Sequence, residues 1–450
     1  MHADVERFSH DPAKRFLRVI QQQGRVALAA DGNEQAAILL DYLRELAVDV
    51  IGDFGTPANP ANTKPGEGFR ITRQEGRMGI APGRFWVDGL PCTNDDEALS
   101  YGAQADYPQS PDLPERGRFV VYLDVWERHI SAAQDPSIRE VALGGPDTCT
   151  RAHLVWQVKA AQVDESNTAL TTSKQAVQLW HKNWHPRLDI PWRGRMAVEV
   201  DRDGGPPDPC QAPEGAGYFG RENQLYRVEV HRGGAIGGAA PPTFKWSRDN
   251  GSVVYPLAAI EGTTATLLDP PLDCTKQLVT GTLVEVVDDV TALHATPGVL
   301  ARVVDVEDDG DDVVVHLSAG PAGVIDAGLH PMLRRWDHPL GEGLDEYAVV
   351  EGGSDPVALE DGIGVRFAAP DGGAPTHVYR TGDYWTFPAR AALGDVVWPR
   401  AADGSPEFVG PQGIDHHMAP LAVVNADEAD DTAAVLDCRV GFARLATLFP

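Results

Sequence analysis

The sequence contains no paired cysteines and no long apolar run. Its 450 residues include five cysteines, namely Cys92, Cys149, Cys210, Cys274 and Cys438. Because they are odd in number, far apart and never in a Cys-x-x-Cys pair, they exclude a disulfide framework and a zinc knuckle, and we expect buried free thiols. No apolar stretch approaches the roughly 20 residues of a membrane-spanning helix. Segment Met1–Arg7 lacks the order of a signal peptide, so we expect a cytoplasmic protein without a membrane span.

Basic residues are scarce in this chain. It has 38 Lys and Arg against 66 Asp and Glu, which gives a formal net charge of -28. A surface of that sign repels phosphate backbones and anionic lipid headgroups, so nucleic acid and membrane surfaces are excluded as expected partners. The charge suits a protein that binds basic or neutral protein partners.

Motifs of common catalytic sites are missing as well. The sequence has no Gly-x-Ser-x-Gly, no His-Glu-x-x-His and no Gly-Lys pair of a phosphate-binding loop. The acidic run Asp308–Asp312 could hold calcium, but it lacks the alternating ligands and distal Glu of an EF-hand, so a solvated β-turn is the preferred interpretation. We therefore predict no catalytic, cofactor or metal site, and a protein that is not an enzyme.

Two pairs of histidines were considered as metal ligands. His416 and His417 are neighbours, and on a strand their side chains would point to opposite faces, away from a shared metal ion. His181 and His185 have the i, i+4 spacing of a helix, but Pro186 directly after them argues against a regular helix. Neither pair is therefore predicted to bind a metal.

What the sequence has in abundance is glycine and proline, 46 and 35 residues. Together they favour many turns and short strands over long helices, and 450 residues exceed one ordinary core. We predict a mainly β, multidomain chain in which an N-terminal arm and a single amphipathic helix precede several small β-sandwich or barrel domains. The predicted ranges are 1–68 for the arm and helix, 69–160 for a β domain, 161–260 for an irregular insertion with a β-hairpin, 261–340 for a small SH3-like barrel, and 341–450 for a C-terminal β domain.

The predicted helix lies near the start of the chain. Asp31 is a suitable N-cap with Glu34 completing a capping box, and Gly52 is a stop signal. Apolar residues recur at helical spacing from Ala36 to Val50. The next segment is too rich in Pro, Gly and Asn to cover this stripe, which must pack on a distant β domain or on a partner chain. Its candidate oligomer or assembly contacts are Leu39, Leu40, Leu43, Leu46 and Val50.

Several strands are predicted from apolar runs and turn residues. The run ending at Asp88-Gly89 predicts a hairpin, and Phe119–Trp126 predicts a strand buried on both faces or nearly so. A second hairpin is predicted over residues 244–255, with a turn at Asn250-Gly251. Most of the ten tryptophans lie inside such strand patterns, where they more often serve the core.

The start of the chain resembles a family of uncharacterised proteins encoded in gene clusters for phage tails and extracellular contractile injection systems. The matching segments are His10–Phe16, Gln22–Val26 and Ala30–Gln35. Gly32 stands where that pattern usually has Trp, and Ala29 where it has Asp, so neither position is indispensable. Similar segments follow along nearly the whole chain: Arg84–Leu90, Val121–Arg128, Ala142–Thr148, Glu222–Glu229, Phe244–Arg248, Tyr379–Trp385 and Gly413–His417.

The resemblance implies a structural or adaptor component of a contractile tail-like particle. Its opening is also similar to phage baseplate and tail-fibre-associated proteins, in which an N-terminal helix precedes β domains and chains often form trimers. This implies partners among the particle's proteins, a homo-oligomer, and export as part of a released particle. No catalytic residues come with it. The alternative is a glycan-binding or glycan-degrading protein on such a particle, with paired carboxylates and exposed Trp, most plausibly within residues 180–260.

Overall fold

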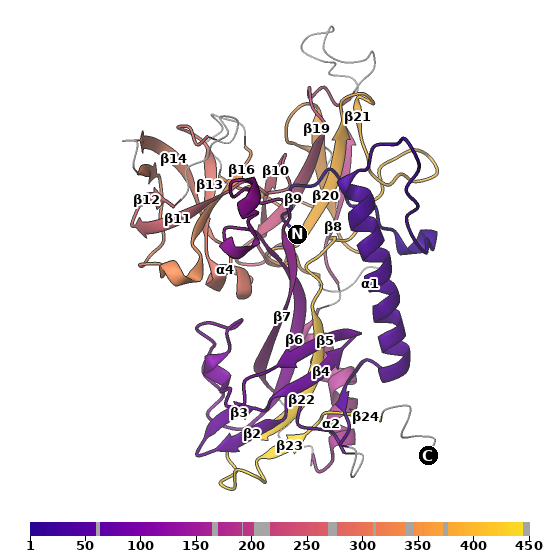
Figure 1. Cartoon of the computed structure of the whole chain (residues 1–450), viewed down its shortest axis with the longest axis vertical. Coiled ribbons are helices and arrows are strands. Elements are labelled where there is room, and N and C mark those ends of the chain that lie inside the picture. Colours follow the sequence, from indigo (N-terminus) through magenta and orange to yellow (C-terminus); the bar gives the residue numbers. More distant parts are fainter. Residues whose placement is uncertain are drawn as a thin grey trace. The chain divides into compact units, whose positions relative to one another are not determined.

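The computed structural model describes most of the chain (Figure 1). The described residues are 1–59, 64–163, 170–190, 192–201, 217–268, 277–308, 312–338, 345–353, 355–371 and 377–443. Strands make up 38% and helices 15%, in several sheets and one barrel, which confirms the predicted fold class. Within these residues, no helix is long and apolar enough to cross a membrane.

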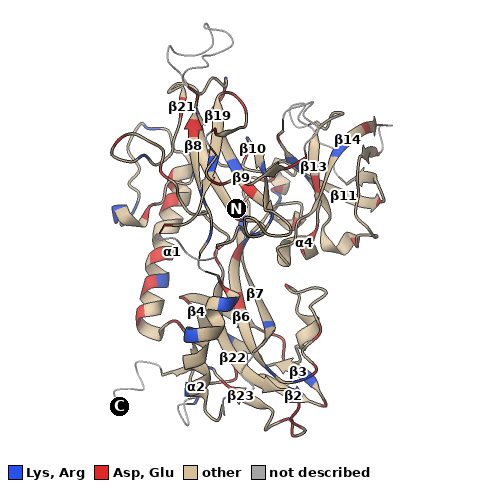
Figure 2. Cartoon of the chain, turned by 180° about the vertical axis from the view of Figure 1, so that it is seen from behind, with Lys and Arg blue, Asp and Glu red and all other residues tan. Residues whose placement is uncertain are grey.

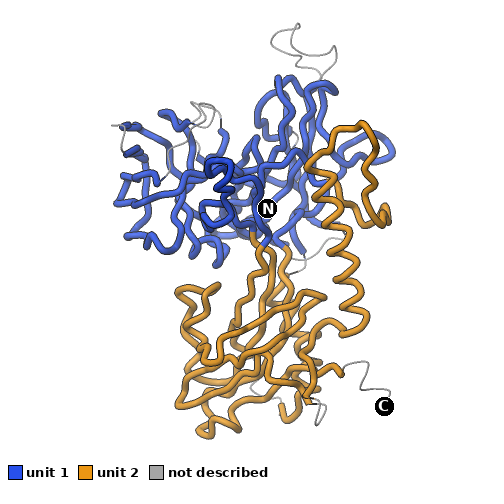
Figure 3. The backbone as a smooth tube through the Cα atoms, in the orientation of Figure 1, with its two compact units in different colours: residues 1–8, 129–152, 192–414 blue, residues 9–128, 153–191, 415–450 orange. Residues whose placement is uncertain are grey.

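The chain divides into two compact units, each built from segments far apart in the sequence (Figure 3). Unit 1 comprises residues 1–8, 129–152 and 192–414. Unit 2 comprises residues 9–128, 153–191 and 415–450. The first eight residues thus belong to unit 1, whereas the following arm and helix belong to unit 2.

Unit 1 contains a β-sandwich of two sheets. The first sheet has the order β17 (Tyr347–Ala348), β10 (Thr243–Ser247), β9 (Gln224–Arg232), β20 (Tyr384–Arg390) and β21 (Asp395–Val396). The second has the order β18 (Val357–Ala358), β19 (Ile363–Ala368) and β8 (Arg195–Val200). Both sheets contribute to one aromatic-rich core, in which the rings of Phe244 and Trp385 pack against Phe367. Buried aromatic area of this kind is the main stabilising contribution in such a sandwich.

The second part of unit 1 is the small barrel that the sequence predicts. Six strands close in the order β11 (Val254–Glu261), β12 (Thr264–Leu267), β15 (Val313–Leu317), β14 (Val299–Asp308), β13 (Leu283–Val287) and β16 (Met332–Trp336). Alternate residues such as Val284, Val303 and Leu333 fill its interior. The short helix α4 (Asp289–Leu293) follows β13 and is capped by Asp288. Residues 309–311 of the acidic run lie outside the described residues.

The prediction of a hairpin around Asn250-Gly251 is wrong. Asn250 and Gly251 do adopt positive φ values of 54° and 63°, as the turn chemistry requires. However, β10 before the turn pairs with β9 and β17, while β11 after it pairs with β12 and β16. An Asn-Gly pair specifies the local reversal of the chain, but the partner of each strand depends on distant segments.

Unit 2 contains two four-stranded sheets and a separate two-stranded hairpin. One has the order β24 (Gly441–Phe442), β1 (Phe54–Pro57), β4 (Gly83–Val87) and β5 (Leu90–Asn94). The other has the order β23 (Val435–Asp437), β22 (His417–Asn425), β6 (Arg118–Ile130) and β7 (Arg151–Gln162), and a separate hairpin joins β2 (Ile71–Gln74) to β3 (Arg77–Ile80). The predicted hairpin at Asp88-Gly89 is confirmed, since Val87 pairs with Leu90. The predicted strand Phe119–Trp126 is buried throughout and forms part of β6.

The stretch after β7 is more regular than expected from its polar sequence. Helix α2 (Ser173–Leu179) continues through one π-helical turn (Trp180–Trp184) into α3 (His185–Leu188). Pro186 lies at the start of α3, directly after the π-helical turn. Trp180 and Trp184 are buried there against Tyr122 and Val423. The prediction of an irregular segment is therefore wrong over residues 173–188.

Five 3-10 turns complete the described secondary structure: Pro12–Lys14, Tyr101–Ala103, Pro136–Ile138, Val141–Leu143 and Ala327–Leu329. The longest helix of the described residues is α1 (Ala29–Ile51), which carries the predicted apolar stripe. Its C-terminus is as predicted, with Gly52 at φ 96° and its N–H donating to Val48 O at 2.8 Å.

The start of α1 differs from the prediction. Leu28, not Asp31, is the N-cap residue, so the helix begins two residues before Asp31. Asp31 instead occupies the third helical position, where its carboxylate accepts a hydrogen bond from the N–H of Leu28 at 3.5 Å. An acidic side chain is favourable in the first turn because of the partial positive charge there. Ala29 and Ala30 can extend the helix because alanine has the highest helix propensity.

Candidate assembly interface

The predicted apolar stripe of α1 lies on the protein surface. All five candidate contact residues are exposed, by 48% for Leu46 up to 57% for Leu43, and Tyr42 beside them is 62% exposed. Only Ala30 and Ile38 of this helix are buried. The sequence favoured packing of this stripe within the chain, but in the structure these five side chains are exposed. Exposed apolar area of this extent, concentrated on one element, is typical of a protein–protein contact.

The exposed side chains follow a heptad pattern. Ala36, Leu39, Leu43, Leu46 and Val50 are spaced by three, four, three and four residues, and each is exposed. This is the spacing of the a and d positions of a coiled coil, at which a helix packs against a second helix. Leu40 and Ala47 widen the seam on one side. We call these seven residues the α1 seam.

Charged residues are absent from the α1 seam. The charged side chains of the helix are those of Asp31, Glu34, Asp41, Arg44, Glu45 and Asp49. They stand at the remaining heptad positions, and Figure 2 shows them as separate coloured bands on the ribbon of α1. A second helix could therefore cover the α1 seam without burying a charge, which would otherwise be expensive.

The other side of α1 is held on unit 2. Arg44 forms an ion pair with Glu127 of β6, and the Ile38 side chain is buried. Gly89 in the β4–β5 turn lies so close that a Cβ atom there would be 2.6 Å from the carbonyl oxygen of Arg44. This close approach, together with a φ of 78°, requires glycine at that position. The orientation of the α1 seam is thus fixed relative to the β-sheets of unit 2.

The arm before α1 adds to the exposed apolar surface. It contacts the N-terminal half of the helix through Ser9 Oγ, which donates to Glu34 at 2.6 Å, and through Val19 N–H, which donates to Gln35 at 2.9 Å. A hydrogen bond of 2.6 Å joins His10 to Asp41. Its exposed apolar side chains are Phe16, Leu17, Ile20, Val26 and Leu28, of which Leu17 is 84% exposed.

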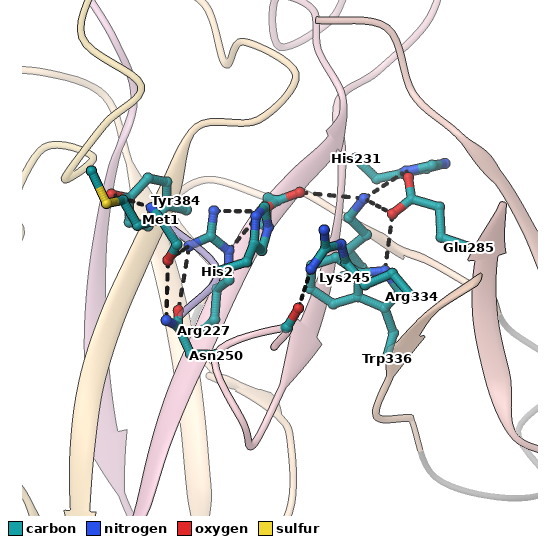
Figure 4. A network of polar contacts seen from close by, with 12 residues as sticks. Met1, His2, Arg227, His231, Lys245, Asn250, Glu285, Arg334, Trp336 and Tyr384 are labelled. Atoms are coloured by element: carbon teal, nitrogen blue, oxygen red, sulfur yellow. Dashed lines mark hydrogen bonds and ion pairs between the residues drawn. The ribbon is translucent and has the colours of Figure 1, made fainter. Parts of the chain in front are cut away.

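A second candidate site is a buried network of charges in unit 1 (Figure 4). The Lys245 ammonium, on β10, lies 2.5 Å from the carboxylate of Glu285 and 3.3 Å from that of Glu229. It also lies 4.4 Å from the centre of the Trp336 ring, in a cation–π contact. His231 Nδ1 is 3.4 Å from Glu285. These side chains come from the sandwich and from the barrel, so the network joins the two parts of unit 1.

The first three residues of the chain close this network. The carbonyl oxygen of Met1 accepts hydrogen bonds from Arg227 at 3.3 Å and from Asn250 at 3.0 Å, and Asn250 also donates to Ala3 O at 2.8 Å. The His2 ring lies 2.9 Å from a carboxylate oxygen of Glu229. The segment thus forms hydrogen bonds with Arg227, Glu229 and Asn250.

The electrostatics of the network fit a structural role. Burial lowers the pKa of His2 well below its usual value, and nearby Arg227 lowers it further, so His2 is neutral at physiological pH. Burial acts to raise the pKa of Glu285, but Lys245 and His231 outweigh it and hold that pKa at about 2. Each carboxylate is therefore charged and paired. We assign the network to holding unit 1 together.

A partly buried carboxyl group with a raised pKa lies beside the sandwich core. Glu360 accepts a hydrogen bond from Tyr226 Oη at 2.8 Å and one from Arg248 at 2.6 Å. Burial raises the pKa of Glu360 to about 7, even though Arg248 and Tyr226 act to lower it. The folded state therefore binds a proton at Glu360 more tightly than the unfolded state does.

We expect this proton to make the effect of Glu360→Gln depend on pH. The protonated carboxyl group of Glu360 contributes fully to stability only below the unfolded pKa near 4.5. Its contribution declines as the pH rises towards 7. Relative to the wild type, the free energy of unfolding of the variant should gain about 2 kcal/mol between pH 4.5 and 8, after allowance for partial exposure. Urea denaturation at several pH values measures this gain. A difference that does not change with pH would contradict it, and Glu407→Gln is the surface control.

The four histidines of the two pairs have different partners, and His181 and His185 lie on the helical segment that Pro186 was expected to prevent. His416 Nδ1 lies 2.8 Å from Asp124 of β6, while His417 Nδ1 lies 3.0 Å from Asp88 in the β4–β5 turn. His181 stacks on Phe54 instead of turning towards His185. No group of three or more potential metal ligands occurs within the residues that the structure describes.

The cysteines and tryptophans serve mostly as core residues. Cys92 and Cys438 are buried free thiols and Cys149 is an exposed one, while Cys210 and Cys274 lie outside the described residues. Seven of the ten tryptophans are buried, namely Trp126, Trp180, Trp184, Trp246, Trp336, Trp385 and Trp398. Trp192 is 48% exposed. Few indole rings are thus available as platforms for sugars.

Sequence reasoning missed the buried network. A signal was present in β9, where Arg227, Glu229 and His231 alternate with apolar residues and therefore share one face of the strand. Such alternation is typical of a strand with one face in solvent. Here the barrel and the N-terminal residues cover that face, and all three side chains are buried.

Comparison with known proteins identifies a family but no activity. Residues 1–190 and 194–448 match the Family of unknown function (DUF6519), which covers nearly the whole chain. No curated protein and no solved structure matches it. The match spans α1, both units and the buried network.

Proposed function

This chain belongs to the Family of unknown function (DUF6519), which assigns no activity, and we propose from its surface and sequence that it is a structural or adaptor component of a contractile tail-like particle. It acts through protein–protein assembly, with other particle proteins and with copies of itself, up to a trimer. The resemblance of the N-terminal segments to proteins of such gene clusters supports the setting. The strong negative charge supports basic or neutral protein partners over nucleic acid.

The observation that carries this proposal is the exposed α1 seam. Burying a leucine side chain contributes about 1.5–3 kcal/mol, and each copy offers four leucines and a valine on this helix. The sum is comparable with the roughly 4–15 kcal/mol that association costs in lost freedom of motion. A seam that the chain leaves exposed, on a helix fixed by the opposite side, is therefore suited to a stable contact.

The test is the association of the chain with isolated particles. Particles sedimented from producing cells should contain the wild-type chain, and the double variant Leu43→Glu/Leu46→Glu should be depleted at least tenfold. Leu393→Glu is the matched control, since Leu393 is 68% exposed and belongs to unit 1, whereas α1 belongs to unit 2. Equal amounts of wild type and double variant in the particle fraction, or absence of the wild type from it, would contradict the proposal.

A glycan-directed function has no specific support among the described residues. It would need an open cleft with two carboxylates and exposed aromatic rings. Within the range 180–260, Trp192 is exposed, whereas Trp246 is fully buried. The glycan alternative therefore stays a prediction from the sequence.

A further inference from the structure

We infer that unit 2 holds a binding pocket for a small organic cation, that is, a molecule with an apolar body and an ammonium group at one end. The inference goes beyond the proposed function and does not depend on it. The pocket has a volume of about 290 Å³ and lies between the β2–β3 hairpin, the segment before β6 and the adjoining ends of β22 and β23 (Figure 1). Since a cavity of roughly 150 Å³ holds one benzene ring, this pocket has room for a ring with a short chain.

The interior of the pocket is apolar. Its lining includes the side chains of Ile71, Met78, Leu113, Phe119, Val424 and Val435. All but Leu113 and Val435 are buried in the main core of unit 2, and these two pack against that core. The fold itself therefore forms this wall, and a methionine within it can repack around ligands of different shape. An apolar body gains free energy by leaving water for such a surface.

An anionic ligand is disfavoured, because the basic lining residue, Arg73, is already bound. Its Nε lies 3.2 Å from the carboxylate of Asp431. One of its terminal nitrogens donates to the carbonyl oxygens of Glu428 at 2.9 Å and Asn425 at 3.3 Å. A carboxylate or phosphate would have to displace these acceptors to reach the guanidinium, and would meet the carboxylate of Asp431 there.

The acidic lining residue, Glu115, supplies the charge that selects a cation. Its side chain is exposed, and among the described residues it forms no ion pair. Ala426 also lines the pocket, and the loop that follows it carries four acidic residues and no basic one, namely Asp427, Glu428, Asp430 and Asp431. Arg77 and Arg116 are exposed neighbours of lining residues in the sequence, but neither lines the pocket. The mouth of the pocket therefore attracts a positive group.

Three probes of nearly equal size separate the effect of the apolar body from that of the charge: phenylpropylamine, phenylpropanol and phenylpropionate. Ligand-observed NMR with the full chain measures their dissociation constants. The amine is expected to bind with a dissociation constant on the order of 0.1–1 mM, as its size allows. The propionate should bind about tenfold more weakly, with the alcohol between them.

Two variants locate the binding. Glu115→Gln should weaken binding of the amine about two- to fivefold, the range of an exposed charge pair, and leave binding of the alcohol unchanged. Glu261→Gln is the matched control, because Glu261 is exposed and belongs to unit 1. Ala426→Phe places a ring in the pocket and should abolish binding of all three probes, while the circular dichroism spectrum stays that of the wild type.

Equal affinity for the amine and the propionate, or an amine affinity that Glu115→Gln does not change, would overturn the selection of a cation. Binding of the probes to a folded Ala426→Phe variant at wild-type strength, or no binding of any probe to the wild type, would overturn the pocket as the site. A short basic peptide with a central Phe that binds where the amine does not would assign the pocket to a protein partner instead. Particle sedimentation decides the proposed function separately in every case.

Discussion

Replacement of Lys245 by methionine is expected to lower the free energy of unfolding of unit 1 by about 3–5 kcal/mol, because it leaves buried carboxylates without their shared cation. Methionine keeps much of the length and the apolar stem, so the loss comes mainly from the charge. Glu285 is affected most, since its carboxylate is 2.5 Å from the Lys245 ammonium. Glu229 keeps a second cation, Arg227, at 2.6 Å.

Hydrogen exchange in increasing urea measures this effect for each unit separately. Peptides from β9, β10 and β13 should lose protection at lower urea in Lys245→Met, whereas peptides from β6 and β22 of unit 2 should not change. Lys174→Met is the control, because Lys174 is exposed on α2. A loss below about 1 kcal/mol, the range of a surface pair, would show that the network contributes little to stability.

Leu43→Glu is expected to abolish self-association without unfolding the chain. Leu43 is the central a position of the α1 seam, and its loss from two facing helices removes about 3–6 kcal/mol of apolar burial, which corresponds to roughly 10²- to 10⁴-fold weaker association. The charges that replace it would also repel each other. Because Leu43 is 57% exposed in the single chain, the free energy of unfolding should change by only about 0.5 kcal/mol.

Light scattering over a range of concentrations measures this association. The wild type should show a mass that rises with concentration to that of an oligomer, and Leu43→Glu should remain a single chain. Leu393→Glu should behave as the wild type, since Leu393 is exposed outside the α1 seam. An unchanged oligomer in Leu43→Glu would mean that another surface joins the copies.

The sequence predicts local structure of this chain well because local signals suffice for it. The period of the apolar residues predicted α1, and turn residues predicted the hairpin at Asp88-Gly89. The same period predicts the apolar stripe of α1 residue by residue. Its exposure was not predicted, because it depends on how much of the chain folds back over the helix.

Long-range pairing is where sequence reasoning fails. The Asn250-Gly251 turn predicts a hairpin, but β10 pairs with β9 and with the distant β17, and β11 pairs with β12 and with the distant β16. Charges on one face of β9 look like a solvated surface until the barrel and the N-terminal residues cover them. Likewise, the division into two units joins segments hundreds of residues apart, which a pass along the chain does not reveal.

The Asn250-Gly251 turn has two structural roles at once. It is the direct link from the sandwich to the barrel, and its Asn250 amide also holds the carbonyl groups of Met1 and Ala3. At Gly251, any side chain would have to displace His2, because a Cβ atom would lie 2.9 Å from the imidazole. A side chain at position 251 would therefore disturb the link between the sandwich and the barrel and the seat of the first three residues together.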